Sequence, residues 1–157
     1  MQFISHLKEL TALYTYEYPR PTVTVDIAIF RPLGEEYQIL LIQRARVPYK
    51  GKYALPGGFI EMDESLEAAA RRELFEETGV KNLQLTQIQT FSDPGRDPRG
   101  RVISTCFGCV LGVGDQIQIQ AGDDAADADW FRLNDLPPLA FDHAVLIQVA
   151  ITKLLPS

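Results

Sequence analysis

The sequence predicts a mixed α/β domain in which helices cover a sheet. Most of the chain alternates apolar and polar residues as strands do, one segment near the middle repeats with helical spacing, and an apolar helix comes last. The 157 residues are 46% hydrophobic and 23% charged, which is typical of a globular domain that closes its core without disulfides. We find no repeat or linker, so we expect residues 1–157 to form a single domain.

The first half of the chain predicts one short helix, two strands and a loop. Apolar residues from Phe3 to Leu13 recur at helical spacing, and the next apolar residues alternate with the period that buries one face of a strand. Glycine and proline punctuate the segment after the second strand. In order, we expect a helix at 1–14, strands at 23–30 and 37–43, and a loop at 51–58.

The clearest helix is expected at 64–78. Asp63 or Ser65 is placed to cap its N-terminus, and Gly79 is placed to end it. Later segments alternate as strands do, apart from an acidic loop and a last apolar helix. In order, we expect strands at 83–91, 102–111 and 116–120, a loop at 121–129, a short strand at 130–131, a cap at Asp142 and a helix at 143–155.

Composition and charge exclude several classes of protein. The net charge is −6, and most of it lies between residues 58 and 80, where seven acidic residues outnumber two arginines. An acidic protein binds nucleic acid poorly without specific contacts, so we expect no nucleic-acid partner. We see no apolar run long enough for a membrane span and no secretory signal, and two cysteines build no disulfide framework. We therefore expect a cytoplasmic protein with no membrane partner.

Three glutamates at the end of the 64–78 helix point to chemistry. Glu73, Glu76 and Glu77 share one helical face, in the last turns, where the helix dipole disfavours negative charge. A site for hard divalent cations would explain this arrangement, since Mg²⁺ takes carboxylate and carbonyl oxygens. Spacing alone favours an exposed acidic face equally well.

Residues 58–80 resemble the Nudix box, a pattern of glycine, glutamate and arginine at fixed gaps. The preceding residues 53–57 resemble the family's lead-in, with Tyr53 where the family often has tryptophan. The resemblance implies a Nudix-type α/β/α sandwich with a mixed β-sheet. The matching positions are Gly58, Glu64, Arg72, Glu73, Leu74, Glu76, Glu77, Gly79 and Val80.

The resemblance also implies a reaction, the hydrolysis of a nucleoside diphosphate linked to another group. It implies Mg²⁺, or alternatively Mn²⁺, and roles for the box residues. Arg72 would orient the carboxylates, Glu64 would be an accessory residue, and Gly58 and Gly79 would support the box. The implied metal ligands are Glu73, Glu76, Glu77 and the carbonyl of Gly57.

The general base is less clearly indicated. In the family it is often an acidic residue on a loop after the box, and four aspartates follow here, at 123, 124, 127 and 129. We favour Asp124 as a catalytic residue. Glu76 in the box is the alternative base, and Glu77 is expected to be catalytic as well. For any single aspartate an acidic surface loop is the simpler explanation.

A second motif, residues 91–101, places arginines on a Gly/Pro-rich loop suited to phosphate or ribose. Composition alone favours a surface turn with Arg–Asp pairs, but the segment resembles the signature of ADP-ribose pyrophosphatases and related Nudix domains. Residues 137–143 resemble the same branch, and we expect His143 there to make a structural contact or to lie near the base pocket. The expected substrate-binding residues are Arg44, Arg96, Asp97, Arg99 and Arg101.

The leading hypothesis is Mg²⁺-dependent hydrolysis of ADP-ribose to AMP and ribose 5-phosphate. One alternative is a Nudix hydrolase of NADH, a dinucleoside polyphosphate or a damaged nucleoside triphosphate. Another is a non-catalytic sensor of ADP-ribose, which the complete box disfavours. The resemblance also implies a homodimer, with the apolar N-terminal segment as one possible interface.

Overall fold

A computed structural model describes residues 14–122 and 125–157. The helix predicted near the N-terminus falls on residues outside this range, apart from Tyr14, and so does Asp124. No helix among the described residues is long and apolar enough to cross a membrane.

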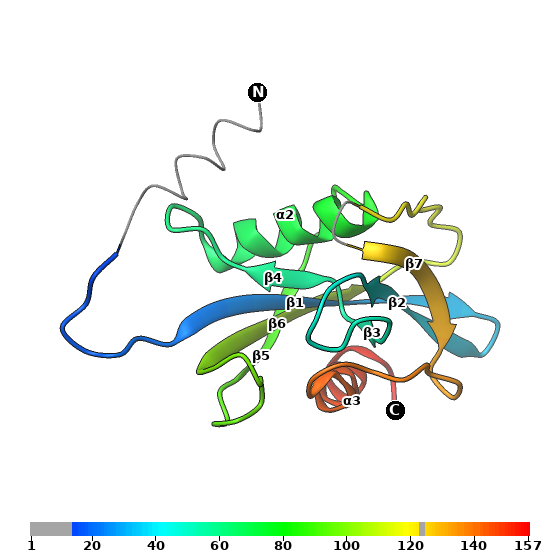
Figure 1. Cartoon of the computed structure of the whole chain (residues 1–157). Helices are drawn as coiled ribbons and strands as arrows, with labels where there is room; N and C mark the ends of the chain where they lie inside the picture. Colours follow the sequence, from blue (N-terminus) through cyan, green and yellow to red (C-terminus); the bar gives the residue numbers. More distant parts are fainter. Residues whose placement is uncertain (1–13, 123–124) are drawn as a thin grey trace.

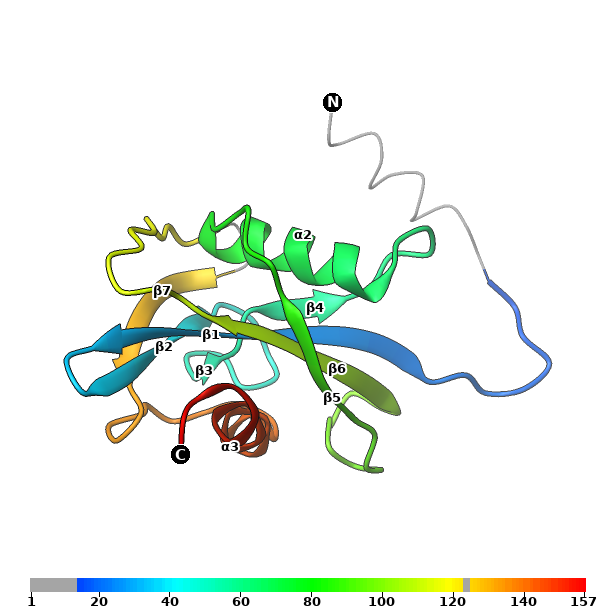
Figure 2. The ribbon, with the colours of Figure 1, turned by 180° about the vertical axis from the view of Figure 1, so that it is seen from behind.

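Seven strands form one mixed sheet with a helix on each face (Figures 1 and 2). Helix α2 (Leu66–Thr78) covers one face, and α3 (His143–Leu154) covers the other. This confirms the predicted α/β/α sandwich. The strands are β1 (Thr22–Leu33), β2 (Glu36–Arg44), β3 (Tyr53–Ala54), β4 (Gly57–Phe59), β5 (Thr86–Phe91), β6 (Val102–Val110) and β7 (Ala125–Arg132).

Strands β1 and β2 pair only near the turn that joins them and then separate. They are antiparallel neighbours from Phe30 opposite Ile39 to Leu33 opposite Glu36. Beyond that point β1 pairs with β4 and β2 pairs with β3, while β6 runs parallel to β1 along its other edge. The segment 53–59 therefore fills a fork between the two strands.

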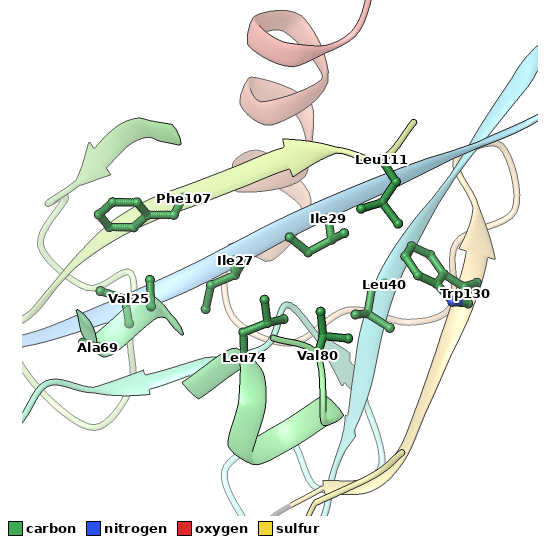
Figure 3. Packing of buried hydrophobic residues seen from close by; sticks show 11 residues of the cluster. Val25, Ile27, Ile29, Leu40, Ala69, Leu74, Val80, Phe107, Leu111 and Trp130 are labelled. Atoms are coloured by element: carbon green, nitrogen blue, oxygen red, sulfur yellow. The ribbon is translucent and has the colours of Figure 1, made fainter. Parts of the chain in front are cut away.

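Alternation along β1 divides the core between the two helices. Val25, Ile27 and Ile29 belong to a buried cluster with α2 residues such as Leu74 (Figure 3). Residues of opposite parity pack with Leu146 and its neighbours on α3. Burial of apolar side chains on both faces is the main force that holds the layers together.

The ends of the helices agree with the sequence in part. Ser65 caps α2, because its hydroxyl accepts a hydrogen bond from the Ala68 amide at 3.2 Å. Gly79 ends α2 with a φ of 74°, a conformation that favours glycine. Asp142 occupies the N-cap position of α3, but its side chain makes no capping bond, so the predicted cap is wrong there.

Two predictions between residues 116 and 131 are also wrong. Residues 116–120 form no strand, and their isoleucines pack beside the α2 cluster instead. The acidic segment 125–129 is not a loop, because it belongs to β7, which pairs along β2 from Arg44 to Gln38. Backbone pairing outweighs the weak strand preference of aspartate, whose side chains here lie on the exposed side of the strand.

Candidate active site

Arg72 joins three carboxylates of the box through hydrogen bonds. Its guanidinium makes a bidentate pair with Glu64 and donates to Glu73 Oε1 at 2.8 Å and to Glu76 Oε2 at 3.2 Å. It also donates to the Phe59 carbonyl at 3.1 Å, which joins α2 to β4. These hydrogen bonds, first of all those with Glu64, raise the pKa of Arg72 and lower the pKa of Glu64.

Two glycines let β4 approach β1 and α2 closely. A Cβ on Gly57 would lie 2.1 Å from the Val25 carbonyl oxygen, so β1 and β4 could not keep their pairing. A Cβ on Gly58 would lie 2.6 Å from Glu73 Oε1. The Glu73 carboxylate therefore packs directly against the backbone of residue 58.

Glu73 has the character expected of a metal ligand. Its side chain is 12% exposed, and desolvation raises its pKa even though Arg72 lowers it in part. Its oxygen donors, those of Glu76 and Glu77 and the Gly57 carbonyl are the type that hard divalent cations take. The chemistry of the donor set thus fits Mg²⁺ or Mn²⁺.

The three carboxylates do not converge on one point in the described part of the chain. No group of three His, Cys, Asp or Glu side chains is close enough there to hold a metal ion. Arg72 takes one oxygen of Glu73 and one of Glu76. The Glu76 side chain is 55% exposed, so it has room to rotate toward a cation.

A cavity of about 90 Å³ lies at the fork between β1 and β2. We call it the arginine cavity, because three arginines reach it from the end of β2 and from the β5–β6 loop. Phe59 and Phe141 supply aromatic walls. The charged or titratable residues that line it are Asp26, Arg44, Glu77, Arg96, Asp97, Arg99 and His143.

A wider groove of about 630 Å³ adjoins this cavity. We call it the carboxylate groove, because Glu73, Glu76 and Glu77 line it together with the 57–63 segment and Tyr14. Four residues line both spaces, namely Gly57, Gly58, Phe59 and Glu77. Ligand pockets usually have volumes of ~300–1,000 Å³, so the groove is large enough for a nucleotide and the smaller arginine cavity extends it.

Arg96 and Arg99 each face an aspartate. Arg96 donates to both oxygens of Asp142, at 2.9 and 2.7 Å, and its side chain is only 5% exposed. Arg99, 36% exposed, makes a bidentate pair with buried Asp97. Burial opposes ionisation of Asp97, but the Arg99 hydrogen bonds outweigh it and lower the pKa of Asp97.

Phe141 brings two guanidinium groups together. Arg44 lies 4.8 Å and Arg99 5.0 Å from the centre of its ring, and Arg99 is also 4.8 Å from the ring of Phe59. Burial, followed by repulsion from Arg99, lowers the pKa of Arg44. An anion between Arg44 and Arg99 would relieve this repulsion, which Asp97 relieves in part through its pair with Arg99.

His143 lines the arginine cavity and is buried. Its Nδ1 accepts a hydrogen bond from the Leu55 amide at 3.0 Å, so its proton is on Nε2, which lies 3.4 Å from Asp26 Oδ1. Asp26 Oδ2 also accepts a bond from buried Ser104. Of the two expectations for His143, the structure thus shows the contact and also places the side chain on the cavity wall.

We predict that His143 makes the fold sensitive to acid. Desolvation lowers its pKa, so the folded protein takes up a proton there at a lower pH than the unfolded chain, which does so at about pH 6.5. The free energy of unfolding should therefore fall as the pH drops below about 6.5, by at most ~1.4 kcal/mol per pH unit from this group. Urea unfolding between pH 7.5 and 5 measures this slope.

Replacing His143 with asparagine should remove that part of the slope, because an amide oxygen can still accept from Leu55 and does not titrate. The same replacement at His6, the other histidine in the sequence, serves as the control. An unchanged slope in His143→Asn would mean that another group causes the acid sensitivity.

The structure does not bring every predicted residue to this site. Arg101 lines neither space, and its guanidinium donates to the Ser92 carbonyl instead. Asp127 accepts a 3.5 Å bond from the Tyr53 hydroxyl, and Asp129 accepts from the Trp130 amide. Neither aspartate lines the cavity or the groove. Asp124 lies outside the described residues, so its role as a base stays a prediction.

Sequence reasoning missed several residues of the site. Phe59, Phe141 and Asp26 line the arginine cavity, yet none of them was expected to have a role there. The sequence did offer one sign for Asp26, because a charged residue within the apolar run of β1 indicates a buried polar role. Phe141 and Asp142 lie in the segment 137–143 that resembles the ADP-ribose pyrophosphatase branch, but the resemblance does not indicate that they contact Arg44, Arg96 and Arg99.

Comparisons with known proteins agree with this geometry. An ADP-ribose pyrophosphatase of Methanocaldococcus jannaschii is 46% identical over 131 residues, 83% of this chain and 73% of that protein. The ADPR responsive transcriptional repressor NtrR of Acinetobacter baylyi is 37% identical over 159 residues, and the match covers 98% of this chain but 62% of the repressor.

A solved structure shares the fold. It is the NUDIX domain of Shewanella oneidensis NrtR complexed with ADP ribose, with a TM-score of 0.82 and 32% identity, covering 94% of this chain and 97% of that one. The family model of the NUDIX domain matches residues 20–149. The chain therefore belongs to the Nudix family of pyrophosphohydrolases.

Proposed function

We propose that this protein hydrolyses ADP-ribose to AMP and ribose 5-phosphate with the help of Mg²⁺. The observation that carries the proposal is the junction of the two spaces. Glu77 and the Gly57–Phe59 segment line both the carboxylate groove and the arginine cavity. A diphosphate placed at this junction would lie between the carboxylates of α2 and the guanidinium groups of Arg44 and Arg99.

The chain's own residues divide the work of binding. Arg99 and Arg44 would neutralise phosphate charge, and Arg72 would hold Glu73 in place. Glu73, Glu76, Glu77 and the Gly57 carbonyl would hold the metal ion. When bound, a divalent cation lowers the charge of the diphosphate and makes a bound water a better nucleophile.

Product release from a panel of substrates tests this proposal. The panel contains ADP-ribose, NADH, a diadenosine polyphosphate and 8-oxo-dGTP, each with and without Mg²⁺. We expect AMP from ADP-ribose and a loss of roughly 10²–10³-fold in kcat for Glu77→Gln, by analogy with the loss of one group that stabilises the transition state. Turnover chiefly of another member would refute the proposed substrate and keep the reaction type.

A sensor of ADP-ribose is the second proposal, because the A. baylyi repressor matches 98% of the chain. A sensor would bind ADP-ribose without turning it over, with or without Mg²⁺. Calorimetry beside the turnover assay separates the two. Tight binding with no product from any member of the panel would favour the sensor and refute the hydrolase.

We further propose that the protein is a cytoplasmic homodimer that acts on small nucleotides, with residues 1–157 as one domain. The apolar residues proposed for the interface, Phe3 to Leu13, lie outside the described range. Light scattering of the purified chain measures the oligomeric state directly, and a monomeric mass would refute the dimer.

A further inference from the structure

Three consecutive residues at the start of α3 contact residues from four other segments that line the arginine cavity. Phe141 stacks with Arg44 and Arg99, Asp142 binds Arg96, and His143 accepts from the Leu55 amide and faces Asp26. These partners come from β1, the end of β2, the β3–β4 segment and the β5–β6 loop. None of the three residues belongs to the box.

The backbone at this point has an unusual conformation. Phe141 has a φ of 51°, in the left-handed region that a bulky side chain rarely adopts. Such a residue is retained only where the surrounding structure compensates for the strain, and it occurs often in functional sites. Here the ring of Phe141 is also packed edge-on against Tyr49, 4.9 Å away.

Asp142 gives a second, independent sign. An aspartate at the N-cap position normally binds an amide of its own helix, but this one makes no such bond. Both of its oxygens accept from Arg96, 46 residues away in sequence. Its side chain therefore fixes a loop arginine and contributes no capping bond to α3.

We propose that Phe141, Asp142 and His143 are positioning residues for substrate binding. Phe141 holds Arg44 and Arg99 side by side against their mutual repulsion, so that both face the anion. Asp142 holds Arg96 in the cavity wall, and His143 fixes the 55–57 segment that carries the Gly57 carbonyl. This inference rests on the proposal that the arginine cavity binds part of a phosphorylated substrate.

Steady-state kinetics of Phe141→Leu and Asp142→Ala test the inference. We expect the KM for ADP-ribose to rise about tenfold in each, with kcat within about threefold of wild type, because stacking and charged bidentate bonds have roughly this strength. The conservative variant Phe141→Tyr keeps the aromatic ring and should have a KM for ADP-ribose close to that of wild type. Val145→Ala changes a 56% exposed residue of the same helix and is the matched control.

Thermal unfolding separates positioning from a purely structural role. A KM within twofold of wild type in both variants would overturn the inference, and so would a fall in kcat and Tm at unchanged KM. Titration of inorganic pyrophosphate, which has no base or ribose, gives a readout that needs no turnover. We expect both variants to bind it about tenfold more weakly than wild type.

The pyrophosphate titration also separates a failure of the proposed substrate from a failure of the positioning role inferred for Phe141 and Asp142. A wild type that binds pyrophosphate but neither binds nor hydrolyses ADP-ribose refutes the proposed substrate. In that case the inference is supported by weaker pyrophosphate binding in the variants and overturned by equal binding. A wild type that binds neither anion overturns both.

Discussion

Replacing Arg72 with alanine should lower both stability and activity by a large amount. The guanidinium binds Glu64, Glu73, Glu76 and the Phe59 carbonyl, and its side chain is 22% exposed. Its removal leaves the carboxylates of Glu64 and Glu73, each 12% exposed, without their cation, which costs about 2–4 kcal/mol in comparable cases. For a chain of this size, that corresponds to a fall in Tm of roughly 5–15 °C.

The control for this prediction is Arg71→Ala, a change in the exposed neighbour on the same helix, which should leave Tm and kcat near wild type. The double variant Arg72→Ala with Glu64→Gln should regain part of the lost stability, since it removes one unpaired charge. If Arg72→Ala melted at the wild-type temperature, the carboxylates would be solvated well enough to need no arginine.

The two adjacent glycines of β4 should respond differently to alanine. In Gly58→Ala the new Cβ meets the carboxylate of Glu73, a side chain that can move, so the cost should fall on activity. A displacement of about 1 Å in a catalytic group can lower kcat/KM roughly 10²-fold. The loss of stability should stay near ~1 kcal/mol.

In Gly57→Ala the new Cβ meets backbone atoms of Val25 and Asp26, which cannot move without separating β1 from β4. We expect the free energy of unfolding to fall by about 3 kcal/mol or more and the activity to fall with it. Chemical denaturation and steady-state kinetics of both variants measure the contrast. Equal losses of stability would show that the Glu73 carboxylate does not yield to a methyl group.

The shared helical face of the box glutamates could be predicted from the sequence because it is local, whereas the metal and the reaction came from the resemblance to the Nudix box. Helical spacing alone brings Glu73, Glu76 and Glu77 to one face and places Arg72 within reach of the first two. The bonds from Arg72 to Glu64 and to the Phe59 carbonyl leave the helix and do not follow from its spacing. The caps of α2 are local too, and Ser65 and Gly79 lie where their residue types indicate.

The other half of the site depends on contacts that no local pattern encodes. Phe141 meets Arg44 and Arg99 only because β1 and β2 separate and α3 starts beside the gap. Asp142 has the residue type of a cap, but a bidentate ion pair with Arg96 is stronger than a bond to an amide. The strand at 125–132 likewise depends on its pairing with β2 and not on its composition.

The fork between β1 and β2 affects how the ligand preference of such a protein can evolve. An unbroken sheet separates whatever lies above it from whatever lies below it. Here β1 and β2 part, and the 53–59 segment lies between them. Glu77 of α2 and His143 of α3 both line the arginine cavity, and residues 57–59 are the border that it shares with the carboxylate groove. On the proposed function, substitutions on the α3 side of the fork should change which molecule is bound while the carboxylates of α2 stay as they are.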